Sequence, residues 1–68
     1  MKYAVVIEHG PTSYGASVPD LPGCIAVAAT RDEVERLIQG AIAIHLAGLR
    51  ADGLPIPESQ TLVTTVEV

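Results

Sequence analysis

The residues that could do chemistry in this 68-residue chain are eight carboxylates, two histidines and one cysteine. Carboxylates that converge on divalent metal ions would suit metal-dependent cleavage of a phosphodiester. Here Glu8 stands near the end of the first strand-like segment, Glu67 stands in the last one, and Asp20 lies in a loop. The acidic residues at the start of a predicted helix, which capping and solvation explain, are Asp32, Glu33 and Glu35. The sequence therefore predicts no two-metal site.

The two histidines and the cysteine fit structural roles better than catalytic ones. His9 precedes Gly10-Pro11, which is typical of an exposed or locally hydrogen-bonded turn histidine. His45 falls on the apolar side of the predicted helix, and no Cys, Asp or Glu at helical spacing completes a ligand set. Cys24 has no His or basic neighbour to activate it, so we expect an inert, buried thiol. With no phosphate-binding loop, dinucleotide fingerprint or nucleophile elbow, we expect no enzyme activity, no cofactor and no metal.

Four segments rich in β-branched or apolar residues are predicted as strands, namely residues 3–8, 13–18, 24–29 and 60–68. The turn Gly10-Pro11-Thr12 joins the first two as a hairpin. The first and third segments are apolar at nearly every position, so we expect both faces of these strands to be covered.

A helix is predicted between the third and fourth strands. The Thr30 hydroxyl can cap the amide of Glu33, whose carboxylate can reach back to the amide of Thr30. The helix should run to residue 51 or 52 and stop at Gly53, because Pro55 and Pro57 prevent its continuation. The expected fold is α+β, of order β-β-β-α-β: a four-stranded mixed sheet with one helix on one face, in a single domain over residues 1–68.

The two sides of this helix differ in character. The apolar stripe expected to pack on the sheet comprises Val34, Leu37, Ile38, Ala41, His45, Gly48 and Leu49, and it is widened by Ile42, Ile44 and Leu46. The opposite side carries mainly small residues, among them Gly40, Ala43 and Ala47. One interpretation is that alanine, the best helix former, simply tolerates solvent. The other is a helix–helix contact between chains, because small residues permit close approach.

Size and composition favour self-association. A domain of 68 residues buries only about 60% of the surface that its unfolded chain exposes. Disulfides or metals usually stabilise such small domains, but there is one cysteine and no Cys/His cluster. Hydrophobic residues make up 49% of the chain against 18% charged residues, more than a small monomer easily hides. We expect at least a homodimer, or a tetramer.

The charge balance restricts the kinds of partner. The net charge is −4 with only four Lys and Arg residues, so no basic stripe can hold phosphates, and the chain alone is not expected to bind DNA. An acidic chain suits a basic protein partner instead. The start lacks the features of a signal peptide and no apolar run is long enough to span a membrane, which predicts a cytoplasmic protein without membrane contact.

Two segments resemble the HicB antitoxin family: Val-Pro-Asp-Leu-Pro-Gly-Cys at residues 18–24 and Leu-Arg-Ala-Asp-Gly-Leu-Pro-Ile-Pro-Glu at residues 49–58. Tyr14 ahead of them and the Thr30…Glu33 helix start between them add to the resemblance. The resemblance implies a partial ribonuclease H-like fold without nuclease activity. It also implies a partner, a HicA-type toxin, which is a small basic RNA-cleaving protein whose active site the antitoxin covers.

The rigid loop of this family-like segment is the candidate contact site for a partner. Pro19 and Pro22 stiffen the loop around Asp20 and Leu21, and a rigid loop loses little entropy on docking, so Asp20 and Leu21 are the expected partner-binding residues. Many HicB antitoxins continue into a DNA-binding domain, whereas this chain stops as its last predicted strand closes. This puts autorepression through DNA in doubt. A separate alternative is an orphan homo-oligomeric HicB-like domain whose toxin has been lost and which could bind a small ligand.

Overall fold

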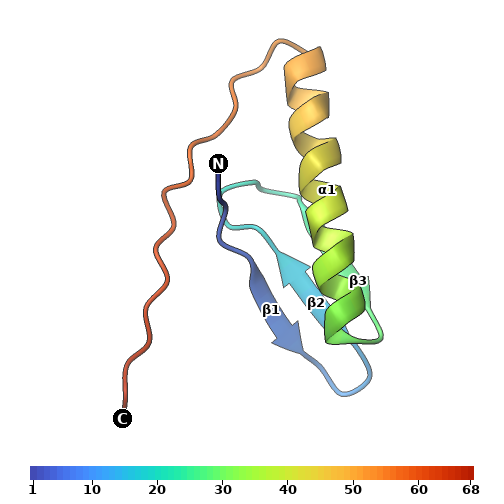
Figure 1. Ribbon diagram of the computed structural model, residues 1–68, viewed down its shortest axis with the longest axis vertical. Helices are drawn as coiled ribbons and strands as arrows, with labels where there is room; N and C mark the ends of the chain where they lie inside the picture. Colours follow the sequence, from blue (N-terminus) through green and yellow to red (C-terminus); the bar gives the residue numbers. More distant parts are fainter.

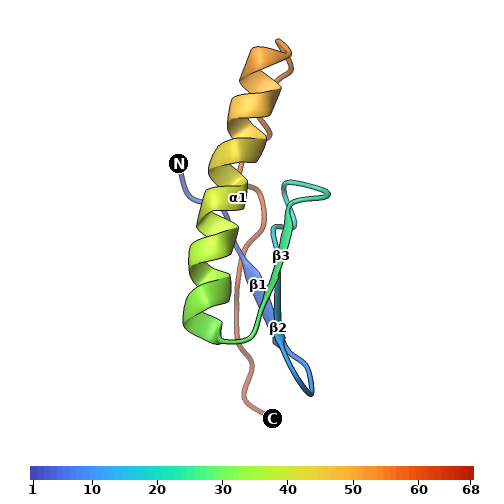
Figure 2. The ribbon, with the colours of Figure 1, turned by 90° about the vertical axis from the view of Figure 1, so that its right-hand side faces the viewer.

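Three short strands and one long helix form the structure, a computed structural model that describes residues 1–68. The elements are β1 (Val6–His9), β2 (Tyr14–Ser17), β3 (Ile25–Ala28) and α1 (Arg31–Ala51). The strands form one antiparallel sheet in the order β1-β2-β3. The helix lies against one face of this sheet and extends beyond it at its carboxyl end (Figures 1 and 2). The predicted α+β class and the β-β-β-α order are confirmed.

The sheet is a meander whose register separates an inner from an outer face. Ala16 pairs with Ile7 on one side and with Ala26 on the other, and all three face the helix. On the outer face, Ser17 lies between Val6 and Ile25. The predicted hairpin turn is closed by the Gly10 amide, which donates to the carbonyl of Ser13 at 2.8 Å.

The helix begins where the local sequence predicts. The side chain of Thr30 accepts a hydrogen bond from the amide of Glu33 at 3.2 Å, which satisfies one of the unpaired amides of the first turn. The expected return bond from the Glu33 carboxylate to Thr30 does not form. The exposed carboxylate needs no partner because water solvates it, and the neighbouring Arg31 instead pairs with Glu35 one turn along at 3.1 Å.

The helix ends at a glycine, also as predicted. Gly53 has a φ of 68°, a left-handed conformation that favours glycine. The amide of Leu54 donates to the carbonyl of Leu49, and the amide of Gly53 donates to that of Arg50. This is a Schellman cap, which satisfies carbonyls that the last helical turn leaves free.

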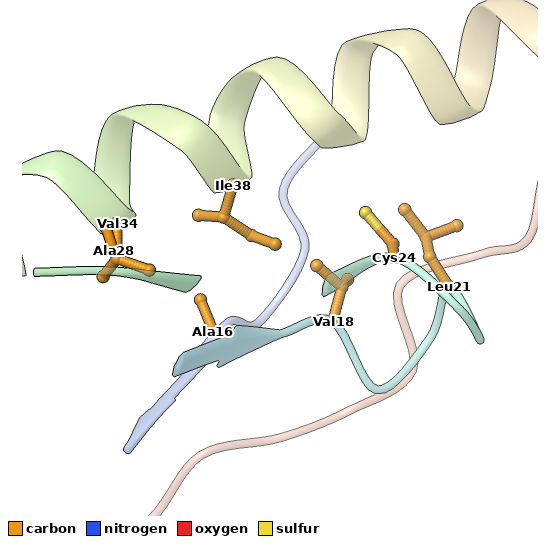
Figure 3. Packing of buried hydrophobic residues seen from close by; sticks show 7 residues of the cluster. All are labelled: Ala16, Val18, Leu21, Cys24, Ala28, Val34 and Ile38. Carbon is orange, nitrogen blue, oxygen red and sulfur yellow. The ribbon is translucent and has the colours of Figure 1, made fainter. Parts of the chain in front are cut away.

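The core lies between α1 and the two strands β2 and β3. Its buried residues are Ala16, Val18, Leu21, Cys24, Ala28, Val34 and Ile38, and they face one another across the two layers (Figure 3). The helix lies over β2 and β3 rather than β1. The predicted apolar stripe is therefore correct at Val34 and Ile38, whereas Leu37 and Ile44 remain 46% and 77% exposed.

Within a single chain, the first and third strands are not covered on both faces. β1 is half-buried at Ile7 and otherwise exposed, because α1 does not cover it. In β3, Ile25 and Val27 are 66% and 65% exposed on the face opposite the helix. One helix can cover only one face of a sheet, so these apolar side chains have no cover within the chain.

The predicted fourth strand is also not formed, so the sheet is three-stranded and antiparallel instead of four-stranded and mixed. Residues 60–68 are extended, but no residue beyond Leu54 takes part in any of the 33 backbone–backbone hydrogen bonds. The segment lies in the layer of the sheet, on the open side of β1 (Figures 1 and 2). High β-propensity favours an extended backbone, but a strand also needs a neighbour whose backbone groups it can pair with.

The chain is therefore more open than a typical monomer of its size. Its accessible surface is 5189 Å², whereas a compact protein of this mass exposes about 4,100 Å². The radius of gyration is 13.2 Å, against about 11 Å for a compact domain of this length. No helix combines the length and the hydropathy that crossing a bilayer requires.

Candidate functional site

The loop of residues 18–24 between β2 and β3 is held rigidly by its own backbone. The amide of Val18 donates to the carbonyl of Cys24 at 3.2 Å, and the amide of Cys24 donates to the carbonyl of Leu21 at 3.0 Å. Gly23 has a φ of 85°, so the loop turns into β3 through a backbone conformation that other residues rarely adopt. The loop therefore presents a surface of fixed shape.

Within this loop, the two residues expected to contact a partner have different environments. Leu21 is fully buried in the core beneath the helix (Figure 3). Asp20 is half-buried, and its carboxylate accepts hydrogen bonds from the amide and the hydroxyl of Thr61 at 3.1 and 3.0 Å. Pro22 and Gly23 form the exposed part of the loop. Leu21 thus anchors the loop, and Asp20 fastens the C-terminal segment to it.

A second tether fastens the same segment further upstream. The hydroxyl of Tyr3, just before β1, donates a hydrogen bond to the carbonyl of Pro57 at 2.5 Å. These two tethers join residues 54 and 41 positions apart in the sequence. No local pattern in the sequence points to either of them.

The helix side with small residues is open to solvent. Gly40, Ala43 and Ala47 are all exposed, and a methyl group added at Gly40 would meet no neighbouring atom. Ile44 beside them is 77% exposed. The structure places these residues on one accessible strip of α1 without a covering element in the same chain.

The histidines and the cysteine have structural surroundings. His9 stacks on Tyr14 of the neighbouring strand, with parallel rings whose centroids lie 4.1 Å apart. His45 is half-buried on the helix. Cys24 lies in the core, and burial raises the pKa of its thiol, which opposes formation of the reactive thiolate. The expectation that Cys24 is a buried thiol is confirmed.

The carboxylates do not converge. Glu8 and Glu67 are exposed at separate places, and the Asp20 carboxylate is occupied by Thr61. No group of three His, Cys, Asp or Glu side chains is arranged to hold a metal ion.

One surface feature was not predicted from the sequence, and we call it the β1 groove. It is an open hollow of about 350 Å³ between β1 and the first half of α1. Val5, Ile7 and Ile38 form its apolar part, and its polar wall consists of Arg31, Glu35 and Gln39. The groove exists because the helix is set over β2 and β3, and this offset depends on three-dimensional packing that the sequence pattern does not reveal.

Comparison with known proteins gives two matches over nearly the whole chain. The family of HicB-like antitoxins of bacterial toxin–antitoxin systems matches residues 3–67. An uncharacterised 14.9 kDa protein from the rep-hol intergenic region of Haemophilus phage HP1 (strain HP1c1) is 34% identical over 62 residues. That alignment covers 91% of this chain and 47% of the phage protein, so the chain spans about half the length of this curated relative. No solved structure gives a significant match.

The family match includes all three strands, the helix, the rigid loop and most of the C-terminal segment. It therefore takes in both segments on which the resemblance to HicB antitoxins was based. This chain belongs to the family of HicB-like antitoxins of bacterial toxin–antitoxin systems.

Proposed function

We propose that this chain binds and neutralises a HicA-type toxin in the cytoplasm, as a protein-binding module without catalytic activity of its own. The observation that carries the proposal is the family match over residues 3–67. An antitoxin of this family has a toxin as its partner. The HicA-type identity of that toxin is the finer part of the proposal and rests on the sequence resemblance.

The charge of the chain supports a basic partner. An RNA-cleaving toxin needs cationic side chains to hold phosphates, and this chain carries a net charge of −4. Opposite net charges speed the encounter of two proteins and favour the correct orientation. The same negative charge disfavours DNA, so we expect residues 1–68 alone not to bind it.

The rigid loop of residues 18–24 remains our candidate for a toxin contact. Its backbone hydrogen bonds and the buried Leu21 hold Asp20 and the exposed Pro22 in fixed positions. A partner that docks there orders few additional groups, so little conformational entropy is lost. In this arrangement Leu21 acts by holding the loop, while Asp20 and the loop surface face the toxin.

Co-expression with the toxin gene from the same operon tests the proposed function. We expect growth to be restored and the two proteins to co-purify as a stable complex. Continued toxicity, together with no complex between the purified proteins, would instead favour the alternative of an orphan homo-oligomeric domain that binds a small ligand.

A pair of variants tests the loop contact. Asp20→Lys reverses a charge at the loop and also removes both hydrogen bonds to Thr61, whereas Thr61→Val keeps the charge and removes only the hydroxyl bond of the tether, because the backbone amide of residue 61 still donates to Asp20. We expect Asp20→Lys to slow toxin association at low salt, with the difference shrinking as salt screens the charges. Thr61→Val should leave the association rate unchanged. Equal slowing in both variants would mean that the tether, and not the charge, affects binding.

We also infer that the chain self-associates, as a homodimer or tetramer. Apolar residues on the outer face of β3, on the helix and in the C-terminal segment are exposed, including Ile25, Ile44 and Val66. Exposed apolar surface of this extent is typical of interaction sites. The helix strip of Gly40, Ala43 and Ala47 is one candidate interface, because its small side chains would let a second helix approach closely.

A further inference from the structure

We propose that the C-terminal segment of residues 62–68 becomes the missing strand by pairing with β1 of a second copy, while the second copy's segment pairs with β1 of the first. This inference specifies the interface of the self-association proposed above and does not depend on toxin binding. Its basis is that one chain carries both an open strand edge and an unpaired strand-like segment, side by side.

The first component of the proposed interface is the open edge of β1. β1 pairs only with β2, so the backbone groups on its other side have no protein partner. The β1 groove runs along this edge, and its apolar part is formed by Val5, Ile7 and Ile38. An added strand would complete the backbone pairing and place alternate side chains over these residues.

The second component of the proposed interface is the segment of residues 62–68, in which successive side chains alternate between the two faces. Alternation in a strand places Leu62, Thr64, Val66 and Val68 on one face, and Val63, Thr65 and Glu67 on the other. The first face is apolar apart from one threonine, so it suits a groove lined by Val5, Ile7 and Ile38. In the single chain, Leu62 and Val66 are 93% and 79% exposed. The segment thus carries the side chains of a buried strand without a cover.

The exposed surface area is large enough for a second copy to be the occupant. The chain exposes 5189 Å², about 1,100 Å² more than a compact monomer of this mass. A standard protein interface buries about 800 Å² on each partner. Reciprocal pairing of two segments with two edges covers surface on both elements in both chains. The excess area is therefore sufficient for a stable dimer.

The position of the segment makes the exchange symmetrical. Hydrogen bonds from Tyr3 to Pro57 and from Thr61 to Asp20 hold the base of the segment next to its own β1. The segment then continues in the layer of the sheet on the open side of β1 (Figures 1 and 2). A two-fold axis near this edge brings each segment to the β1 edge of the other copy at once, as a closed dimer requires. The result is one continuous sheet across two chains.

The alternation of the segment provides a matched pair of variants. Val66→Asp places a charge on the face that covers the groove, and Thr65→Asp places the same charge on the opposite face of the neighbouring residue. Both positions are exposed in the single chain, so each monomer should fold alike by circular dichroism. In sedimentation equilibrium of the 68-residue chain we expect Val66→Asp to weaken dimerisation by about 100-fold or more, because the charge would be buried. Thr65→Asp should change it by less than about threefold.

A helix-face variant and an isotope experiment separate this interface from the alternatives. Ala43→Glu should leave the dimer intact. A sample of labelled and unlabelled chains should give nuclear Overhauser contacts between methyl groups of Val66 in one chain and Ile7 in the other. A monomer at all concentrations, a dimer that Val66→Asp does not weaken, or contacts between these methyls within one chain only would each overturn the proposal. Because no toxin is present, none of these results decides the test of toxin neutralisation.

Discussion

Two regions of the molecule are in opposite structural states. From β1 to Leu54 the chain forms strands, turns and a helix, which together make 33 internal backbone hydrogen bonds. From Pro55 onward the chain is extended, has no backbone–backbone bond, and is fastened by side chains at Pro57 and Thr61. The difference teaches that β-branched composition alone does not make a strand. A strand forms where a neighbouring backbone is available to it.

Two leucines summarise the contrast. Leu21 lies in a loop, yet its side chain is 0% exposed, whereas Leu62 lies in a strand-like segment and is 93% exposed. Hydrophobic burial therefore stabilises the first region in each separate chain. In the second region, hydrophobic burial can contribute to stability only when another surface covers the segment.

The largest expected effect comes from truncating these two leucines in turn. Leu21→Ala should lower the free energy of unfolding by about 3 kcal/mol at every protein concentration, because it leaves a cavity in the core. Leu62→Ala should change the free energy of unfolding of the separate chain, measured at high dilution, by less than about 0.5 kcal/mol. It should weaken only the association of chains. Chemical denaturation at several concentrations measures both. Equal losses in the two variants at high dilution would show that the regions do not differ as described.

The helix cap gives the next largest effect and confines it to the packed region. Thr30→Ala should lower the free energy of unfolding by about 1 kcal/mol through loss of the bond to the Glu33 amide. Thr30→Ser retains a capping hydroxyl and should be close to wild type. An unchanged midpoint in urea for Thr30→Ala would indicate that the cap contributes nothing to stability.

A smaller effect should come from the tether that links the two regions. Asp20→Asn replaces one of the two oxygens that accept from Thr61 with an NH2 donor and removes the negative charge that strengthens the remaining bond; it should lower stability by about 0.5 kcal/mol, because the site is partly open to water. Its clearer consequence is faster hydrogen exchange at the Thr61 amide, measured by NMR. Glu58→Gln, which removes a nearby exposed carboxylate without a hydrogen bond, is the control. If the Thr61 amide exchanged as fast in the wild type as in Asp20→Asn, the tether would not hold in solution.

The smallest effect concerns alkaline pH and again belongs to the packed region. Burial raises the pKa of the Cys24 thiol in the folded chain, whereas the unfolded thiol ionises at its ordinary pKa of about 8.5. Above that pH the unfolded state binds fewer protons than the folded state, so stability falls as pH rises toward the folded pKa. Below the unfolded pKa this contribution is fully present. Denaturation measurements should show that the free energy of unfolding declines from neutral to alkaline pH, and that this decline is smaller in Cys24→Ala. Identical declines in the two proteins would show that the Cys24 thiol does not contribute.

Features encoded over a few residues could be predicted from the sequence, while those that depend on distant partners could not. The helix limits were correct because Thr30 and Gly53 act on their immediate neighbours. Burial of Leu21 was missed because loops usually run over the surface, whereas this loop inserts its leucine beneath α1. The tethers from Tyr3 to Pro57 and from Asp20 to Thr61 were missed because they depend on the folded path of the chain.

The fourth strand illustrates the limit of pattern-based prediction. Residues 60–68 have the composition of a strand and run extended (Figure 1), but the strand that the sequence predicted there is not formed. Composition could not indicate whether their backbone would find a partner in the same chain. In the same way the β1 groove follows from the offset of α1 over β2 and β3, which no periodicity encodes.

Hydrogen exchange of the 68-residue chain as a function of concentration tests most directly whether the two regions differ as described. Amides of α1 and β2 should be protected at every concentration, because their bonds lie within one chain. Amides of residues 62–68 should exchange freely at high dilution and gain protection as the concentration rises and the chains associate. Protection of residues 62–68 at the highest dilution, or full exchange at all concentrations, would contradict the claim that this segment becomes a strand only with a second copy.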